Sequence, residues 1–386
     1  MTDSYTQVTR TGYGSRLKNS FAGVIFGILL IIGAIILLWT NEQRSIARQI
    51  GLSQAEKSVI SVSSDQVSEE HNTKLIHTTG QLSADDTLVD DTFWVTTTGL
   101  KLHRKVEMYQ WKEESHSESQ DNLGGSETTT TTYTYDKIWS DSPIDSSYFK
   151  KPEWHQNPNS WQYTSMTKTQ DTIKIGDIHL TDNFVSQINN YQNMTLDMMD
   201  TLTVSSGTGV FVSSSGIYYG ENPSIAQIGD LRVRFEEVPE GEVSVMWQYS
   251  QWNLVAYTTE NGSNITLLDY GYHTAQAMIA LEERNNTILT WILRGLWIFL
   301  LYLGCNLILG PLVMLAKVVP FISSIIGFGT GLISLLFAFI VWPLVIAIAW
   351  MYARPIVSLI VIVFAAGVIW WIVQLQRKKR EPKLGE

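Results

Sequence analysis

Histidines and paired carboxylates are the residues in this sequence most able to bind a metal or move a proton. The seven histidines include no H-E-x-x-H motif and no pair four residues apart on a predicted helix, so we expect no metal site and no cofactor. Carboxylate pairs at 85–86, 90–91 and 236–237 lie in polar runs, which favours a solvated surface over an acid–base dyad. A G-x-S-x-G motif is absent. The sequence therefore predicts no catalytic residue and no enzymatic activity.

Two polar residues interrupt apolar stretches. Arg294 lies about two turns into a predicted membrane span, where a charge either serves function or pairs with a neighbour. Asn306 lies in the middle of the same span and can hydrogen-bond another helix. Small residues spaced four apart let helices approach closely. Two such pairs are candidate helix-packing positions: Gly23 with Gly27, and Gly327 with Gly331.

Four apolar stretches are long enough to cross a bilayer, which takes about 20 residues. The predicted transmembrane helices are 21–39, 288–310, 321–350 and 356–375. The polar segment 40–287 between the first two is expected to form one soluble domain. The expected fold class is α+β, with four transmembrane helices in a 1 + 3 arrangement and a large, mainly antiparallel-β domain inserted between the first and second helices.

Basic residues near the ends of the spans indicate the side of the membrane on which each part lies. The basic tail 376–386 follows the last span and begins with R-K-K-R at 377–380. It places both termini, including the polar N-terminal tail 1–20, in the cytoplasm. Lys317 then lies in a cytoplasmic turn, and the domain 40–287 is lumenal or periplasmic.

The segment 40–287 is strongly acidic. The chain has 27 Lys+Arg and 37 Asp+Glu; removing the three and one before residue 40 and the eight and two after residue 287 leaves 16 and 34, a net charge of −18. Phosphate binding needs lysine and arginine, so nucleic acid is excluded as a partner.

Alternating side chains identify the clearest strand at 100–111. Leu102, Val106 and Met108 share one face with Leu100, and Glu107 and Tyr109 lie on the other. The polar stretch 115–132 is interpreted as a mobile hairpin loop.

Further along the chain, a second hairpin is expected, with strands at 231–235 and 242–247 joined by a Pro-Glu-Gly turn. Helical sequence continues past the first span to about Lys57, and a helix from His273 runs into the second span.

Six stretches resemble the TMEM43 (LUMA) family of four-span membrane proteins. They are TNEQR at 40–44, LHRKVEMYQW at 102–111, HQNP at 155–158, ENP at 221–223, IGDLRV at 228–233 and RP at 354–355. The resemblance implies residence in the endoplasmic reticulum and inner nuclear membrane, self-association, and association with lamins and emerin. In a bacterial member the site is the cell (inner) membrane. The family supplies no catalytic residues.

The expected function is a non-enzymatic membrane scaffold that forms homo-oligomers and organises other membrane proteins in the lipid bilayer. Its candidate interaction surface is the exposed side of the strand at 100–111, at Glu107, Tyr109 and Trp111. One alternative is a membrane-bound enzyme or lipid-handling protein with a pocket at the domain–membrane junction, near Arg294 and His273. Another is a channel accessory subunit.

Overall fold

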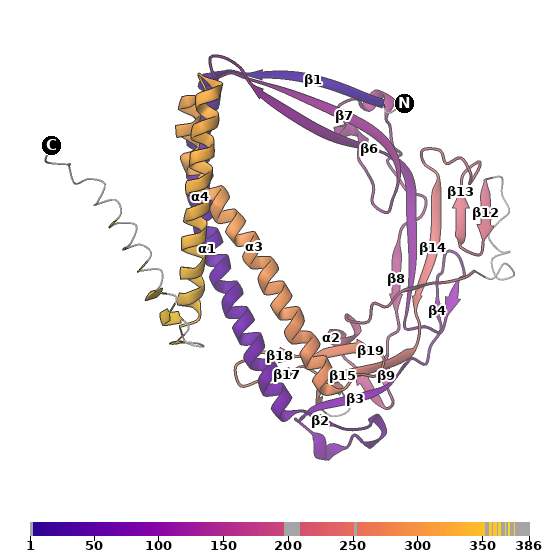
Figure 1. The fold of residues 1–386 in the computed structure, drawn as a ribbon. Helices are drawn as coiled ribbons and strands as arrows, with labels where there is room; N and C mark the ends of the chain where they lie inside the picture. Colours follow the sequence, from indigo (N-terminus) through magenta and orange to yellow (C-terminus); the bar gives the residue numbers. More distant parts are fainter. Residues whose placement is uncertain are drawn as a thin grey trace. The chain divides into compact units, whose positions relative to one another are not determined.

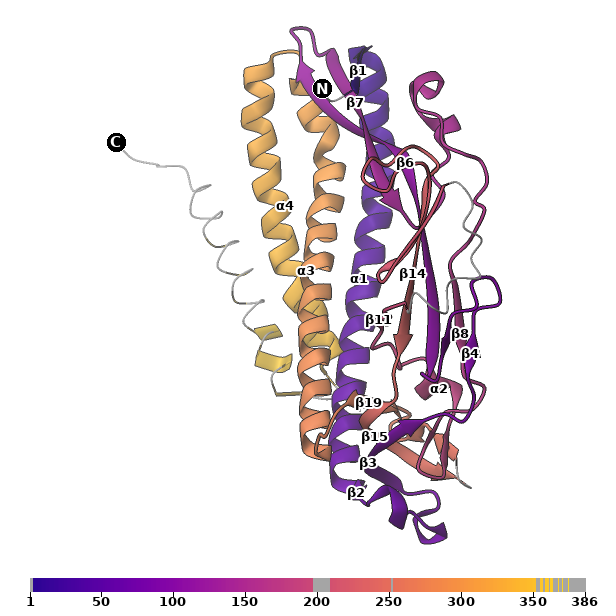
Figure 2. The same cartoon turned by 90° about the vertical axis from the view of Figure 1, so that its right-hand side faces the viewer.

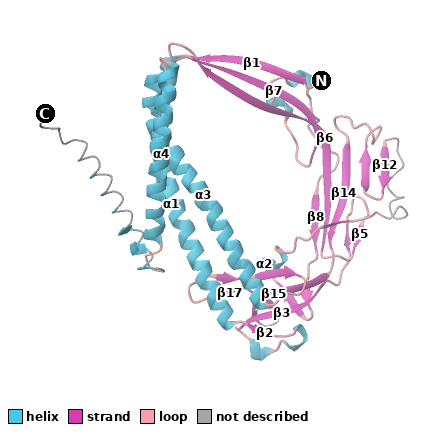
Figure 3. Cartoon of the chain, viewed as in Figure 1, coloured by secondary structure: helices cyan, strands magenta, loops and turns pink. Residues whose placement is uncertain are grey.

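The computed structural model describes residues 3–196, 209–250 and 253–351, with scattered positions between 355 and 374. Figures 1 and 3 show the ribbon by sequence and by secondary structure. The chain divides into two compact units. Unit 1 comprises Met1–Gln7, Ser53–Ser117 and Thr131–Ala280; unit 2 comprises Val8–Leu52, Glu118–Thr130 and Leu281–Glu386.

Three helices are long and apolar enough to cross a membrane: α1 (Tyr13–Ser58), α3 (Ala275–Ala316) and α4 (Pro320–Ala349). They run side by side in Figure 2, and within unit 2 Ala34, Leu301 and Ala338 form their shared core. The expected continuations of the first span to about residue 57, and of the second from about residue 273, are confirmed as single helices.

Two of the helices are longer than the spans expected for them. The stretches 21–39 and 288–310 lie inside α1 and α3, because polar helical sequence extends both helices beyond the apolar part. The third span agrees with α4 to within one residue at each end. The fourth span, 356–375, lies largely outside the described residues, and the tail 376–386 lies wholly outside them.

Unit 1 contains most of two sheets and a short helix, α2 (Asp182–Val185). The strands of the first sheet are β1 (Asp3–Thr11), β6 (Lys101–Asp121), β7 (Glu127–Ser140), β8 (Met166–Thr169), β11 (Gln192–Asn193), β12 (Val210–Ser213), β13 (Gly216–Tyr219) and β14 (Leu231–Val238). Their order is β1-β7-β6-β14-β13-β12, with β8 on β6 and β11 on β14. Because β1 precedes α1, the sheet is not drawn from the inserted segment 40–287 alone.

The second sheet has the order β19-β15-β16-β10-β9-β3-β2, with β15 also paired to β3. Its strands are β2 (Ile60–Ser61), β3 (Leu75–Ser83), β9 (Lys174–Ile175), β10 (Ile178–Leu180), β15 (Gly241–Ser250), β16 (Asn253–Val255) and β19 (Leu267–Tyr270). The second sheet is mixed, because β2 pairs with β3 and β10 pairs with β16 in parallel. Two small ribbons complete the described strands: β4 (Leu88–Val89) with β5 (Thr96–Thr97), and β17 (Tyr257–Thr258) with β18 (Asn264–Ile265).

The expected hairpin of 231–235 with 242–247 is wrong. Strand β14 pairs with β6 and β13 in the first sheet, whereas β15 pairs with β3 and β19 in the second. The chain changes sheets at Pro239. The burial pattern gives the reason: residues 243–247 are all buried, so β15 is covered on both faces, as a strand inside a core is.

The stretch 115–132 is not a loop. Strand β6 continues to Asp121 and β7 begins at Glu127, so only a short turn separates them. Paired hydroxyls support the ladder, with Ser117 Oγ 2.8 Å from Thr131 Oγ1 and Ser119 Oγ 2.9 Å from Thr129 Oγ1. Threonine favours strands, and cross-strand Ser–Thr contacts stabilise an antiparallel pair.

Within unit 2, the turn of this hairpin binds the ends of two helices. Arg16 Nη2 lies 2.6 Å from Asp121 and 2.5 Å from Glu127, and Lys317 Nζ lies 3.1 Å from Asp121. The expected sidedness put Arg16 and Lys317 on one side of the membrane and the whole of 40–287 on the other. The side of the membrane on which each segment lies stays a prediction. Asp121 belongs to 40–287 but contacts both Arg16 and Lys317, so a correct assignment must place these three residues on one side.

Candidate functional site

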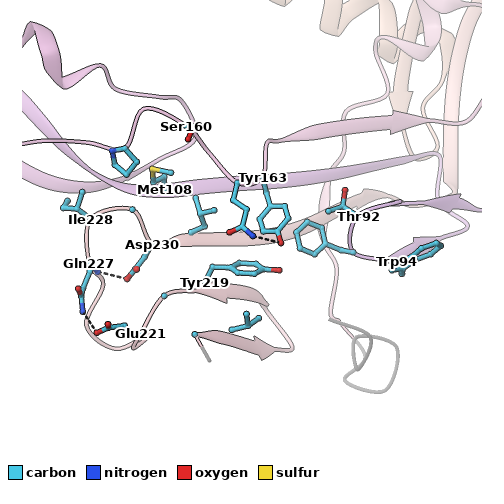
Figure 4. A pocket seen from close by; sticks show the side chains of 18 residues that line it. Thr92, Trp94, Met108, Ser160, Tyr163, Tyr219, Glu221, Gln227, Ile228 and Asp230 are labelled. Atoms are coloured by element: carbon cyan, nitrogen blue, oxygen red, sulfur yellow. Dashed lines mark hydrogen bonds between the residues drawn. The ribbon is translucent and has the colours of Figure 1, made fainter. Parts of the chain in front are cut away.

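Unit 1 contains a cavity of about 900 Å³ between strands of the first sheet and the loops beside them (Figure 4). We call it the Trp94 cleft. It is lined by Thr92, Phe93, Trp94, Met108, Pro158, Ser160, Gln162, Tyr163, Gly209, Val210, Tyr219, Gly220, Glu221, Gln227, Ile228, Gly229, Asp230 and Leu231. These residues come from segments up to 139 positions apart, so the cleft exists only in the folded chain.

Aromatic rings form one wall of the cleft. The centroid of Tyr163 lies 4.9 Å from Phe93 and 4.9 Å from Tyr219, and Phe93 also contacts Phe235 edge-on at 5.7 Å. Phe93 belongs to the core cluster with Met108 and Leu231, which lie opposite each other on β6 and β14. The sheet therefore fixes the positions of these rings.

Trp94 stands at the rim with 63% of its surface exposed. It is one of two described non-glycine residues with positive φ, at +58°. Bulky residues rarely adopt this conformation, and it persists only where the surroundings enforce it. Exposed and held in a strained turn between β4 and β5, Trp94 has the features of a functional side chain.

The turn carrying Trp94 is held by a buried carboxylate. Asp90 Oδ1 accepts the backbone N–H groups of Thr92 at 2.9 Å and Phe93 at 3.0 Å, and the Asp90 carbonyl accepts the Trp94 N–H at 2.7 Å. Arg104 Nη1 donates to both Asp90 oxygens at 2.9 Å. The expectation that the 90–91 pair is solvated is wrong for Asp90, which is fully buried and charge-matched.

The opposite rim is built around Asp230. Its Oδ2 accepts the Tyr218 hydroxyl at 2.5 Å and the Gln227 N–H at 2.7 Å. Burial and the bond to Asp230 raise the pKa of Tyr218, which keeps it a neutral donor. A Cβ on Gly220 would overlap the Asp230 carboxylate, so a larger residue there would have to displace the side chain that holds this loop. The Asp230 carboxylate is thus used to shape the loop.

The chemistry available in the cleft favours binding over catalysis. Burial, followed by the hydrogen bond with Tyr163, raises the pKa of Tyr219, so it stays protonated at neutral pH and is a poor general acid. The charged lining residues are Glu221 and Asp230, and Glu221 accepts from Gln227 Nε2 at 3.1 Å. Among the described residues, no group of three His, Cys, Asp or Glu side chains is placed to hold a metal.

The candidate interaction surface on β6 is largely covered by its own neighbours. Glu107 is only 8% exposed and receives Arg232 Nε at 2.5 Å and Nη2 at 2.9 Å. Burial alone would raise the pKa of Glu107, but the hydrogen bond and charge of Arg232 lower it overall. Tyr109 packs on Trp139 at 5.2 Å, and Trp139 lies under Arg232 at 4.5 Å. This face of the strand is stabilised internally.

Trp111 is fixed by the HQNP stretch. The backbone N–H of Trp111 donates to Asn157 Oδ1 at 2.7 Å, and Asn157 Nδ2 donates back to the Trp111 backbone carbonyl at 2.9 Å. The ring meets His155 edge-on at 4.7 Å, and His155 stacks on Tyr135 at 3.7 Å. Two of the stretches that carry the family resemblance therefore hold each other in place.

Arg294 is paired. In unit 2 its Nε and Nη2 each donate to a Glu42 oxygen at 2.7 Å, and Trp350 Nε1 donates to Glu42 at 2.8 Å. The guanidinium also lies 4.6 Å from the ring centroid of Trp291. Glu42 is fully buried. Asn306 is half-buried on α3. This arrangement is a buried structural ion pair rather than an open polar site.

The candidate packing glycines differ in their surroundings. A Cβ on Gly27 would lie 2.6 Å from the Gly304 carbonyl, and one on Gly23 would meet Leu307 at 3.7 Å. On α4, a Cβ on Gly327 would meet Val313 at 3.8 Å and one on Gly331 would meet Tyr302 at 3.7 Å. Of these four glycines, Gly27 is therefore the one at which another helix backbone approaches closely.

Sequence reasoning did not identify Trp94, Asp90, Tyr163 or Tyr219 as site residues. Each lies in an ordinary polar or aromatic run, and the cleft depends on strand register. One signal was present: four of the six resembling stretches supply lining residues. They contribute Met108, Pro158, Glu221 and Ile228–Leu231.

Comparisons with known proteins identify relatives of this chain. A family model described as Transmembrane protein 43 matches residues 108–355. The chain is 27% identical to Transmembrane protein 43 of Pongo abelii over 366 residues, covering 92% of this chain and 90% of that protein. The Homo sapiens protein of that name is 26% identical with the same coverage. The Drosophila melanogaster homolog is 28% identical over 365 residues, 92% and 95% of the two chains. No solved structure matches significantly.

Proposed function

The chain belongs to the Transmembrane protein 43 family, and from this premise we propose that it is a non-enzymatic, multi-pass membrane scaffold. Its helices anchor it in the bilayer, and its β-rich unit binds a segment of another membrane protein in the Trp94 cleft. The scaffold also associates with copies of itself. In a cell with a nucleus we place it in the endoplasmic reticulum and inner nuclear membrane, and in a bacterium in the inner membrane.

The observation that carries this proposal is the convergence of separate family stretches on one cleft. Met108, Pro158, Glu221 and Asp230 come from four of these stretches and line a single cavity. Internal packing explains why Trp111 and Asn157 hold each other, but it does not explain an exposed tryptophan in a strained turn at the cavity rim. A binding role explains both the exposure and the enforced conformation of Trp94.

Self-association fits the helix α4 better than α1. The Gly27 face is already filled by Gly304 of the same chain. An added Cβ at Gly329 on α4 would meet nothing within 4 Å among the described residues, and Phe328 beside it is 78% exposed. Small residues on an exposed helix face allow close approach of a second helix in a membrane.

A lipid-handling role has one supporting observation. An apolar cavity of about 220 Å³ lies in unit 2 beside Arg294 and is walled by Trp291, Trp342 and Trp350. It is below the range of about 300–1,000 Å³ usual for ligand pockets. Among its described lining residues the charged side chain is Arg294, which is already neutralised by Glu42. The scaffold proposal is therefore the better supported of the two.

The proposal is tested by crosslinking in native membranes followed by affinity purification and mass spectrometry. The full chain is compared with Trp94→Ala and with Trp154→Ala, a matched change of another exposed tryptophan, 78% exposed, that does not line the cleft. We expect a stoichiometric protein partner that is lost only with Trp94→Ala. A partner retained in that variant, or no protein partner of the full chain, would overturn the proposal.

A further inference from the structure

We propose that the Trp94 cleft recognises a basic side chain, lysine or arginine, on the protein segment that it holds. This inference rests on the scaffold function proposed above and adds the chemistry of the partner. It follows from the charge, the aromatic lining and the size of the cleft, which are independent observations.

The charge of the lining has one sign. Glu221 and Asp230 line the cleft, and none of its described lining residues is a lysine or arginine. Asp230 accepts two hydrogen bonds on Oδ2 and packs against Gly220, whereas Glu221 is exposed and accepts one hydrogen bond on Oε2, so Glu221 is the more accessible carboxylate for a ligand. The segment 40–287 adds a net charge of −18, which attracts a basic partner over distance.

The aromatic lining suits a cation. Aromatic ring faces carry partial negative charge and attract ammonium and guanidinium groups within about 6 Å. Trp94, the best such ring, is exposed at one end of the cleft, and Tyr163 and Tyr219 lie nearer its middle (Figure 4). The Arg104 guanidinium already lies 5.4 Å from Phe93, but its charge is matched by the buried Asp90, so it does not make the cleft positive.

The size of the cleft favours a polypeptide over a free cation. A cavity of about 900 Å³ is far larger than one ammonium or guanidinium group. The remaining lining includes the side-chain amides of Gln162 and Gln227 and the hydroxyl of Ser160, which match the donors and acceptors of a peptide backbone. A segment that inserts one basic side chain and lays its backbone along these groups fills the space.

The test uses the full chain in lipid nanodiscs with 5-fluorotryptophan, so that ¹⁹F NMR reports on Trp94 directly. The Trp94→Phe variant assigns its resonance. Three probes are titrated: acetyl-Gly-Arg-Gly-amide, the same peptide with citrulline, which is nearly isosteric but uncharged, and tetramethylammonium, a small free cation. We expect the arginine peptide to shift the Trp94 resonance and the citrulline peptide to bind at least about 3-fold more weakly.

Two charge variants separate the cleft from the acidic surface as a whole. Glu221→Gln removes a lining carboxylate, and we expect it to weaken binding of the arginine peptide by about 2- to 5-fold. Glu260→Gln removes one exposed charge from a residue that does not line the cleft, and it should leave the affinity unchanged. Both positions are exposed, and thermal unfolding checks that both variants are folded.

The outcomes separate this inference from the scaffold proposal. Equal shifts with both peptides, or equal weakening by both charge variants, would overturn basic recognition while leaving a cleft that binds protein. No shift with either peptide would also overturn it. A shift with tetramethylammonium but not with the arginine peptide would assign the cleft to a small cation instead. Loss or retention of the crosslinked partner in Trp94→Ala is a separate result.

Discussion

Gly27 on α1 and Gly304 on α3 lie directly against each other: a Cβ on Gly27 would lie 2.6 Å from the Gly304 carbonyl oxygen, and one on Gly304 would lie 2.9 Å from the Gly27 carbonyl. The two residues are 277 positions apart. Their lack of side chains lets the two backbones touch, which maximises packing between helices that gain nothing from the hydrophobic effect inside a membrane.

The first prediction concerns this contact. Gly27→Ala forces a methyl group into a backbone oxygen and is expected to destabilise the purified chain by about 1–3 kcal/mol in thermal unfolding. Gly33→Ala, on the same helix, is the control, because its Cβ would meet nothing within 4 Å. Alanine favours helix by about 1 kcal/mol, so Gly33→Ala should be neutral or stabilising. Equal effects of both changes would contradict the contact.

The second prediction concerns the buried pair of Glu42 and Arg294. Glu42→Gln leaves a guanidinium that is 8% exposed without its counter-charge, and should cost about 3–5 kcal/mol of unfolding free energy. The double variant with Arg294→Gln should recover part of this loss. Glu114→Gln, in the exposed pair with Lys112, should have no measurable effect. Additive single effects in the double variant would argue against the pair.

The third prediction separates stability from binding at Trp94. Glycine tolerates a φ of +58° without steric cost, so Trp94→Gly relieves strain and removes a side chain that is mostly exposed. We expect an unfolding free energy within about 1 kcal/mol of the parent chain. The same variant should lose the crosslinked partner. A large loss of stability would instead make Trp94 a core residue.

The fourth prediction concerns pH. Arg232 lowers the pKa of Glu107 below its ordinary value of 4.5. A lowered pKa stabilises the fold fully above the unfolded value, and this contribution is lost as the pH falls through the folded pKa. The chain should therefore be more stable than Glu107→Gln at pH 7, and the difference should shrink below about pH 4.5. Thermal unfolding of both proteins across this range measures the difference.

The fifth prediction tests the sidedness of the membrane segments. In a Cys305→Ser background, Asp121→Cys with Lys317→Cys should be joined by a bifunctional thiol crosslinker about as long as a lysine side chain, because Lys317 Nζ lies 3.1 Å from the Asp121 carboxylate. Glu114→Cys with Lys317→Cys is the control. Failure to crosslink would contradict the contact between the hairpin turn and Lys317.

Local periodicity predicted much of the fold. Alternation placed Leu100, Leu102, Val106 and Met108 on one face of a strand, and all four are at most 2% exposed. Apolar length identified α1, α3 and α4. These features depend on residues a few positions apart, so a single sequence contains the information.

Features set by distant contacts were missed. The Pro-Glu-Gly spacing before β15 looks like a hairpin turn, but the partner of β15 is β3, more than 150 residues earlier. Asp90 looked solvated because its counter-charge, Arg104, is brought to it only by the sheet. No sequence pattern pointed to Trp94, since its role depends on a turn conformation and on loops that approach it in the folded chain.

The two members of the Glu42–Arg294 pair are synthesised at different times. Its members are 252 residues apart, so at about 5–20 residues per second Glu42 leaves the ribosome roughly 13–50 s before its partner. During that interval a nascent chain carries Glu42 at the end of its first apolar stretch before Arg294 has been made. A product that stops before residue 294 therefore lacks the side chain that neutralises Glu42 in the folded chain.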